Sequence, residues 1–257
     1  MMPRRIPFVA LLLSTTLLSL THNRPVLGEK SRTGLATNAN FHVLADSQPF
    51  AEELAEKANV LRAEIAKEWL DTFIPDGFGP ASINVFLSDR NVARTWLMDE
   101  NGSRDAHLVW IYSLPENLDA ALAHEIAHIV LANRYAELPA FAHEAVASSY
   151  DGEERRTIRH DALQWFARHN RWPDLARTLT AETINPSNQA GYATAVSIRD
   201  FLFSRSENNR RRFLDFSVYG HKQGWDAALG KYYGFRDLGH FETEWRAWVA
   251  STFAPVE

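Results

Sequence analysis

The spacing of apolar residues divides the chain into a first part that contains strands and a second part that is almost entirely helical. In the first part, three short runs rich in β-branched and aromatic residues predict strands, at 41–44, 83–87 and 107–112. Between and after them, apolar positions three and four residues apart predict three helices, at 48–72, from Asp89 to about Met98, and at 114–131.

Beyond residue 132 the same helical spacing recurs to the end of the chain. It predicts seven helical segments, at 139–150, 153–169, 175–178, 187–205, 208–218, 225–232 and 238–251. Strands followed by helices indicate an α+β fold, in which a small N-terminal sheet packs beside the helix at 114–131 and a mostly helical lobe follows. We therefore expect one domain over 41–251, built from an α/β lobe (41–132) and a helical lobe (133–251).

The N-terminus has the layout of an export signal. Arg4 and Arg5 precede an apolar stretch at 6–20, and Gly28 offers a small residue for cleavage. This stretch is shorter than the roughly 20 residues of a membrane span, so we expect a signal peptide over 1–28 and no stable membrane span after cleavage. An uncleaved anchor and a twin-arginine signal are the alternatives. A polar linker would follow at 29–40, and the mature protein would be periplasmic or secreted.

Composition narrows the possible partners and chemistries. The net charge of -5 and the lack of a long basic tract argue against nucleic acid as a partner. The chain has no cysteine, which excludes disulfides, a thiol nucleophile and thiolate ligands for a metal. Any metal site must therefore use histidine and carboxylate ligands.

A His-Glu-x-x-His string lies at 124–128, inside the helix predicted at 114–131. His124 and His128 are four residues apart, so both imidazoles lie on one helix face and can bind the same zinc ion. Glu125 flanks them, where it can take a proton from a water on the metal without itself being a ligand. In the alternative interpretation, the two histidines are core or partner-contacting side chains.

A catalytic zinc site needs a third protein ligand, and Glu144 is the preferred candidate. The helices at 114–131 and 139–150 are joined by a short link and should pack antiparallel. With a rise of about 1.5 Å per residue, Glu144 then lies level with the space between His124 and His128. His143 on the same helix and Glu137 in the link are the rival ligands.

Two segments, at 122–132 and 138–147, resemble the gluzincin branch of His-Glu-x-x-His peptidases, and in particular exported bacterial peptidase-MA-like proteins. The similarity extends over most of 41–251, although only these two segments are highly specific. The resemblance implies that Glu144 is the third ligand of one zinc ion and that Tyr192 donates a hydrogen bond to the oxyanion. Phe141 and Ala145 stand where the family usually has Trp and Gly.

Ser148 stands where some gluzincins carry an acidic residue beside a ligand histidine. Asp119 or Asp151 is therefore the candidate for orienting that histidine in this chain.

Together these features predict an exported zinc metallopeptidase that hydrolyses peptide bonds in a peptide or protein substrate. The strand at 107–112 is expected to hold the extended substrate by backbone pairing. The alternatives are a catalytically silent, zinc-stabilised binding protein of the cell envelope and a zinc hydrolase of non-peptide bonds.

Overall fold

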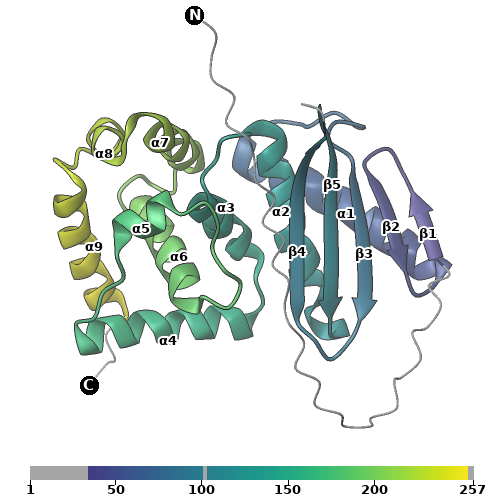
Figure 1. Cartoon of the computed structure of the whole chain (residues 1–257), viewed down its shortest axis with the longest axis horizontal. Coiled ribbons are helices and arrows are strands. Elements are labelled where there is room, and N and C mark those ends of the chain that lie inside the picture. Colours follow the sequence, from purple (N-terminus) through teal and green to yellow (C-terminus); the bar gives the residue numbers. More distant parts are fainter. Residues whose placement is uncertain (1–33, 101–102, 254–257) are drawn as a thin grey trace, which may run out of the picture. The chain divides into compact units, whose positions relative to one another are not determined.

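A five-stranded sheet forms the first part of the fold and a set of helices forms the second, as the computed structural model in Figure 1 shows. The structure describes residues 34–100 and 103–253. The arrangement confirms the predicted α+β class. The predicted signal peptide, 1–28, and the first residues of the predicted linker lie outside the described residues.

The sheet has the strand order β1-β2-β3-β5-β4. Its strands are β1 (Gly34–Thr37), β2 (Phe41–Ala45), β3 (Ala81–Leu87), β4 (Val92–Glu100) and β5 (Ser103–Ser113). β2, β3 and β5 run parallel to one another, whereas β1 and β4 are antiparallel to their neighbours. β5 is thus paired on both sides, so the expectation that residues 107–112 hold a substrate strand is wrong. The edge strands are β1 and β4, and β4 is the one next to β5.

Two further predictions about the first part are wrong, because each of them overlooked a strand. The segment from Asp89 to Met98, predicted as a helix, forms most of β4, because it pairs residue by residue with β5. The predicted linker, 29–40, contains β1, which pairs with β2. In both places a backbone ladder with a neighbouring strand overrides the local pattern.

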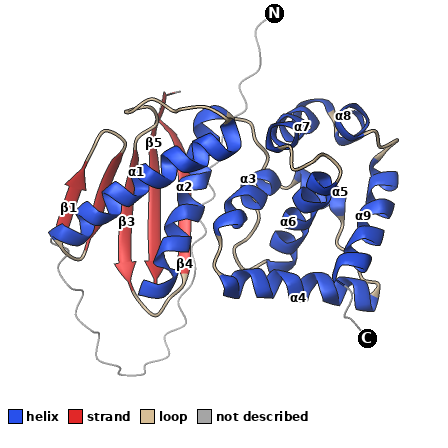
Figure 2. Ribbon diagram, turned by 180° about the vertical axis from the view of Figure 1, so that it is seen from behind, coloured by secondary structure: helices blue, strands red, loops and turns tan. Residues whose placement is uncertain are grey.

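The helices α1 (Gln48–Leu70) and α2 (Leu118–Arg134) cover one face of the sheet (Figure 2). Strand residues that point toward them, such as Val43, Ile83 and Val109, are fully buried. A short 3₁₀ helix, η1 (Pro115–Asn117), precedes α2. The hydroxyl of Ser113, at the end of β5, donates a hydrogen bond to the carbonyl of Leu114, and Asn117 stands at the N-cap of α2.

The second part contains one short 3₁₀ helix and seven α-helices within the described residues. They are α3 (Ala140–Ala147), η2 (Ser148–Tyr150), α4 (Glu153–His169), α5 (Leu175–Thr180), α6 (Gln189–Ser204), α7 (Arg210–Gln223), α8 (Trp225–Tyr233) and α9 (Leu238–Phe253). α6 packs against α3, α4, α7 and α9, and so lies at the centre of this part. Its Ser197 hydroxyl accepts a hydrogen bond from the indole of buried Trp245 (3.1 Å).

None of the helices within the described residues combines the length and the apolar character that crossing a membrane requires.

Phe141 anchors the short helix α3 and offers a test of the packing. Its fully buried ring meets the rings of Phe213 and Trp225 edge to face, with centroids 6.2 and 5.4 Å away. Phe141→Ala should lower the free energy of unfolding by about 3–5 kcal/mol, because the lost side chain leaves a cavity. Phe73→Ala is the matched control, since Phe73 is 70% exposed, and should change it by less than about 0.5 kcal/mol. If Phe141→Ala and Phe73→Ala unfold at the same urea concentration, the described packing of Phe141 is contradicted.

Candidate metal centre

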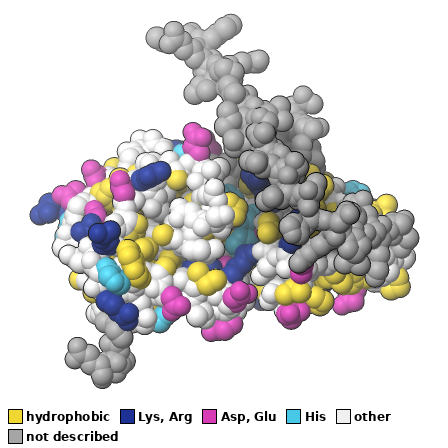
Figure 3. All heavy atoms as spheres, turned by 60° about the horizontal axis from the view of Figure 1, so that its bottom comes forward, with side chains coloured by type: hydrophobic (Ala, Val, Ile, Leu, Met, Phe, Trp, Pro, Cys, Tyr) yellow, Lys and Arg dark blue, Asp and Glu magenta, His cyan; other side chains and the backbone are white. Residues whose placement is uncertain are grey.

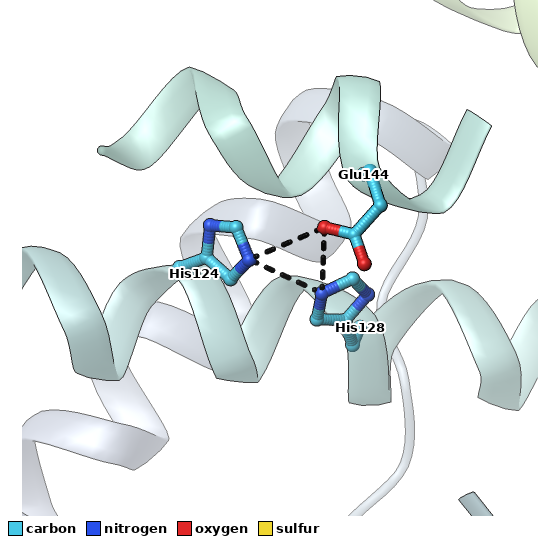
Figure 4. Close-up of side chains that lie close together, drawn as sticks. All are labelled: His124, His128 and Glu144. Atoms are coloured by element: carbon cyan, nitrogen blue, oxygen red, sulfur yellow. Dashed lines mark hydrogen bonds and ion pairs between the residues drawn. The ribbon is translucent and has the colours of Figure 1, made fainter. Parts of the chain in front are cut away.

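Three side chains from two helices converge on one point (Figure 4). α2 presents His124 and His128 on one face, and α3 presents Glu144 opposite them. Glu144 Oε2 lies 3.6 Å from His124 Nε2 and 3.7 Å from His128 Nε2, and the two Nε2 atoms are 3.3 Å apart. Glu144 Oε2 is buried and accepts no hydrogen bond from the described residues. An uncompensated buried carboxylate oxygen facing two imidazole nitrogens is what a metal ion would satisfy, so this group can bind one.

The two rival ligands lie elsewhere. His143 faces the opposite side of the His128 ring, with its Nδ1 3.5 Å from His128 Nδ1. Glu137 is exposed and forms an ion pair with Lys222. The helix geometry expected from the sequence therefore agrees with the structure in placing Glu144 level with the histidine pair.

Asp151, at the end of η2, orients His124. Its Oδ1 lies 3.0 Å from His124 Nδ1, and its Oδ2 accepts a hydrogen bond from Arg159 Nη1 (2.6 Å). Arg155 contacts the same carboxylate at 3.3 Å. Of the two candidate aspartates, Asp119 instead pairs with Lys57. Sequence reasoning missed both arginines, although the four-residue spacing of Asp151, Arg155 and Arg159 was a usable signal.

The ionisable groups at this point affect one another's pKa values strongly. Burial lowers the pKa of His124, but its hydrogen bond with Asp151 and the attraction of the Glu144 carboxylate outweigh burial and raise the pKa to about 10. The pKa values of the two carboxyl groups lie below their usual range, because the attraction of the imidazoles exceeds the cost of burial. Without a metal, His124 therefore carries a proton between two carboxylates. A metal ion needs neutral imidazole, so its binding would release this proton.

Glu125 and Tyr192 complete the surroundings of the three ligands. Glu125 is buried and accepts a hydrogen bond from the hydroxyl of Thr95 on β4. Tyr192, in the first turn of α6, comes within hydrogen-bonding reach of Glu144. Burial and the negative charge of Glu144 raise the pKa of Tyr192, so its hydroxyl stays protonated and can donate. Thr95 was not identified from the sequence, because the segment that contains it was predicted as a helix.

Two cavities, of about 320 and 310 Å³, meet at His124 and form a cleft. Glu125 and Tyr192 line both of them, as does Ala93 of β4. One cavity extends along β4 to Leu97, and the other extends in the opposite direction toward Arg155. The candidate metal centre therefore lies in the middle of a cleft and not at its closed end.

Comparison with protein-family models gives no match, and comparison with curated protein sequences gives none either.

Substitution of a candidate ligand, or of the residue that orients one, should lower the affinity for the metal. Glu144→Ala should lower metal affinity by at least about 100-fold, because it removes a ligand. Asp151→Asn should lower metal affinity by about 10–100-fold, because it weakens the contact that orients His124. Glu137→Ala should leave affinity unchanged and serves as the control. Metal content and competition with a coloured chelator measure the effect. Full metal retention in Glu144→Ala would remove Glu144 from the ligand set.

Proposed function

We propose that this chain is an exported zinc-dependent metallopeptidase of the gluzincin type. The observation that carries the proposal is the convergence of His124, His128 and Glu144 in a cleft, with the carboxylate of Glu125 beside them. These are the residue types and positions that metal-assisted hydrolysis requires.

Zinc suits this group of ligands better than other common ions. Two imidazole nitrogens and one carboxylate oxygen form a typical catalytic zinc set, whereas calcium and magnesium prefer oxygen ligands alone. In tetrahedral zinc sites the ligand atoms lie about 3.3 Å apart, and the three separations in this structure are 3.3, 3.6 and 3.7 Å. Zinc held by these residues would supply an acidified water and a Lewis acid at the substrate carbonyl.

Glu125 is the proposed general base. Its carboxylate would accept the proton of the attacking water and then deliver it to the leaving amine. The hydroxyl of Thr95 holds one oxygen of Glu125, which restricts the rotation of the carboxylate within the cleft. Tyr192, protonated and on the opposite wall, would donate a hydrogen bond to the oxyanion as the carbonyl is attacked.

An extended peptide is the substrate that this cleft fits best. The cleft continues on both sides of the candidate metal centre, so a chain can pass through it and be cut internally. Within the described residues β4 pairs only with β5, and Ala93, Thr95 and Leu97 face the cleft from β4. A peptide could add to this edge through backbone hydrogen bonds, and the alternating β4 side chains would contact its side chains. β4 thus takes the role expected of residues 107–112.

The N-terminal sequence supports activity in the periplasm or outside the cell. Arg4, Arg5 and the apolar stretch at 6–20 carry that part of the proposal.

Replacement of the general base separates metal binding from catalysis. Glu125→Gln should retain one zinc per chain and lose at least about 1000-fold in kcat/KM, because the amide cannot accept the proton. The measurement is cleavage of an unbiased peptide library, with zinc content determined on the same samples. Glu116→Gln, on η1, is the control and should retain activity. If wild-type protein binds zinc but cleaves no peptide, the silent binding protein becomes the better assignment.

Metal removal provides a second test. Chelation should abolish cleavage, and addition of one equivalent of zinc should restore it, whereas magnesium should not. Peptide cleavage that persists in fully metal-free protein would contradict the proposal.

Tyr192→Phe tests the oxyanion donor. Loss of the hydroxyl should lower kcat by about 100-fold or more with little change in KM, because the hydrogen bond forms only as negative charge develops. Tyr219→Phe, on α7 and outside the cleft, is the matched control. A parallel loss in both variants, or none in Tyr192→Phe, would leave Tyr192 without this role.

A further inference from the structure

A third cavity, of about 490 Å³, lies behind η2, between α4, α6 and the end of α9. The arginines Arg156, Arg159 and Arg199 line it, together with Ser148. Arg159 also lines the metal cleft, and the other three residues do not.

Two of these arginines are buried close to each other. Arg159 uses its guanidinium on Asp151 and on the carbonyl of Ser148, and Arg199 pairs with Asp200. The positive charge of Arg199 adds to burial in lowering the pKa of Arg159, which places the two cations within electrostatic reach. An anion in the cavity would relieve this repulsion.

Arg156 supplies a third guanidinium at the cavity. It is exposed, and no ion pair joins it to another described residue. Arg159 is paired with Asp151 and Arg199 with Asp200, so Arg156 is the lining arginine whose charge no ion pair among the described residues offsets. One such cation favours a monoanion over a dianion.

Ser148 adds an unused polar group. Its hydroxyl is buried and has no hydrogen-bond partner among the described residues. An unpaired buried hydroxyl destabilises a fold, and a ligand oxygen could satisfy it.

The rest of the lining includes the apolar side chains of Leu163, Val196 and Phe253. On the face drawn in Figure 3, acidic and basic side chains are interspersed, so the protein surface in view has no single-sign field that would attract every anion. Selectivity would have to come from the cavity, where cationic and apolar walls meet.

We propose that this cavity binds a small organic monocarboxylate. The carboxylate lies against Arg156 and the hydroxyl of Ser148, and the hydrocarbon part lies against Leu163, Val196 and Phe253. Guanidinium groups bind planar carboxylates through two parallel hydrogen bonds, and the apolar wall disfavours inorganic anions. This binding is independent of peptide hydrolysis, so either proposal can fail without the other.

The test is titration of the full, zinc-loaded chain with sodium hexanoate by calorimetry at constant ionic strength. Hexanoate should bind saturably, and Arg156→Gln should weaken it about tenfold, because a charge-assisted hydrogen bond is lost. Arg168→Gln, on the same helix and outside the cavity, should bind as wild type does. Because Arg156 does not line the metal cleft, this pair of variants distinguishes the cavity from a carboxylate bound to the metal.

Two comparison ligands and one further variant sharpen the outcome. Hexanol or inorganic phosphate that binds as tightly as hexanoate would overturn the proposal, as would equal affinities in Arg156→Gln and Arg168→Gln. Ser148→Ala should weaken hexanoate several-fold and leave Tm of the ligand-free protein unchanged or higher. A lower Tm with unchanged hexanoate affinity would assign Ser148 to packing alone and contradict its role in binding.

Discussion

Burial of two ionised carboxylates on either side of His124 is the electrostatic constraint on which the rest of the site depends. Glu144 and Asp151 lose their hydration, and only nearby positive charge can keep both of them ionised. His124 supplies that charge to both, and Arg159 supplies it to Asp151 from behind. The chain of contacts leaves Glu144 Oε2 as the one carboxylate oxygen of this group that is buried without a hydrogen-bond donor among the described residues. The position of the proposed metal is thus defined by a deficit of positive charge.

The short helix that carries Glu144 is held in place by contacts with several neighbouring helices. α3 has only eight residues and is held on both sides, through the ring contacts of Phe141 and through its contact with α6. α6 carries Tyr192 at its start and Arg199 further along, where the Arg199 guanidinium binds the carbonyl of Ala145 at the end of α3. The same helix therefore forms one wall of the cleft and supports the element that carries Glu144. On the opposite side β4 forms the other wall and holds Glu125 through Thr95.

The sequence revealed the helical parts of this arrangement much better than its strands. The periodicity of α2 and the short link to α3 were enough to place Glu144 beside His124 and His128, because helix geometry is local and regular. The strand β4 was mistaken for a helix, since its conformation depends on pairing with β5, which no local pattern records. The central position of β5 was missed for the same reason. Sequence spacing offered Asp151 and Asp119 as equal candidates, and only the packing of η2 against α2 distinguished them.

The proposed ligands and their main support all lie within one continuous stretch, 124–151, whereas Thr95 and Tyr192 come from segments far away in the chain. Contacts between residues close in sequence have a low entropic cost of loop closure and can form early during folding. The contacts that would hold an ion therefore need only α2, α3 and η2. The walls that would make the centre reactive need β4 and α6 as well. For the proposed peptidase, metal binding and attack on a peptide thus depend on different parts of the fold, and a change in β4 or α6 can abolish cleavage while the metal stays bound.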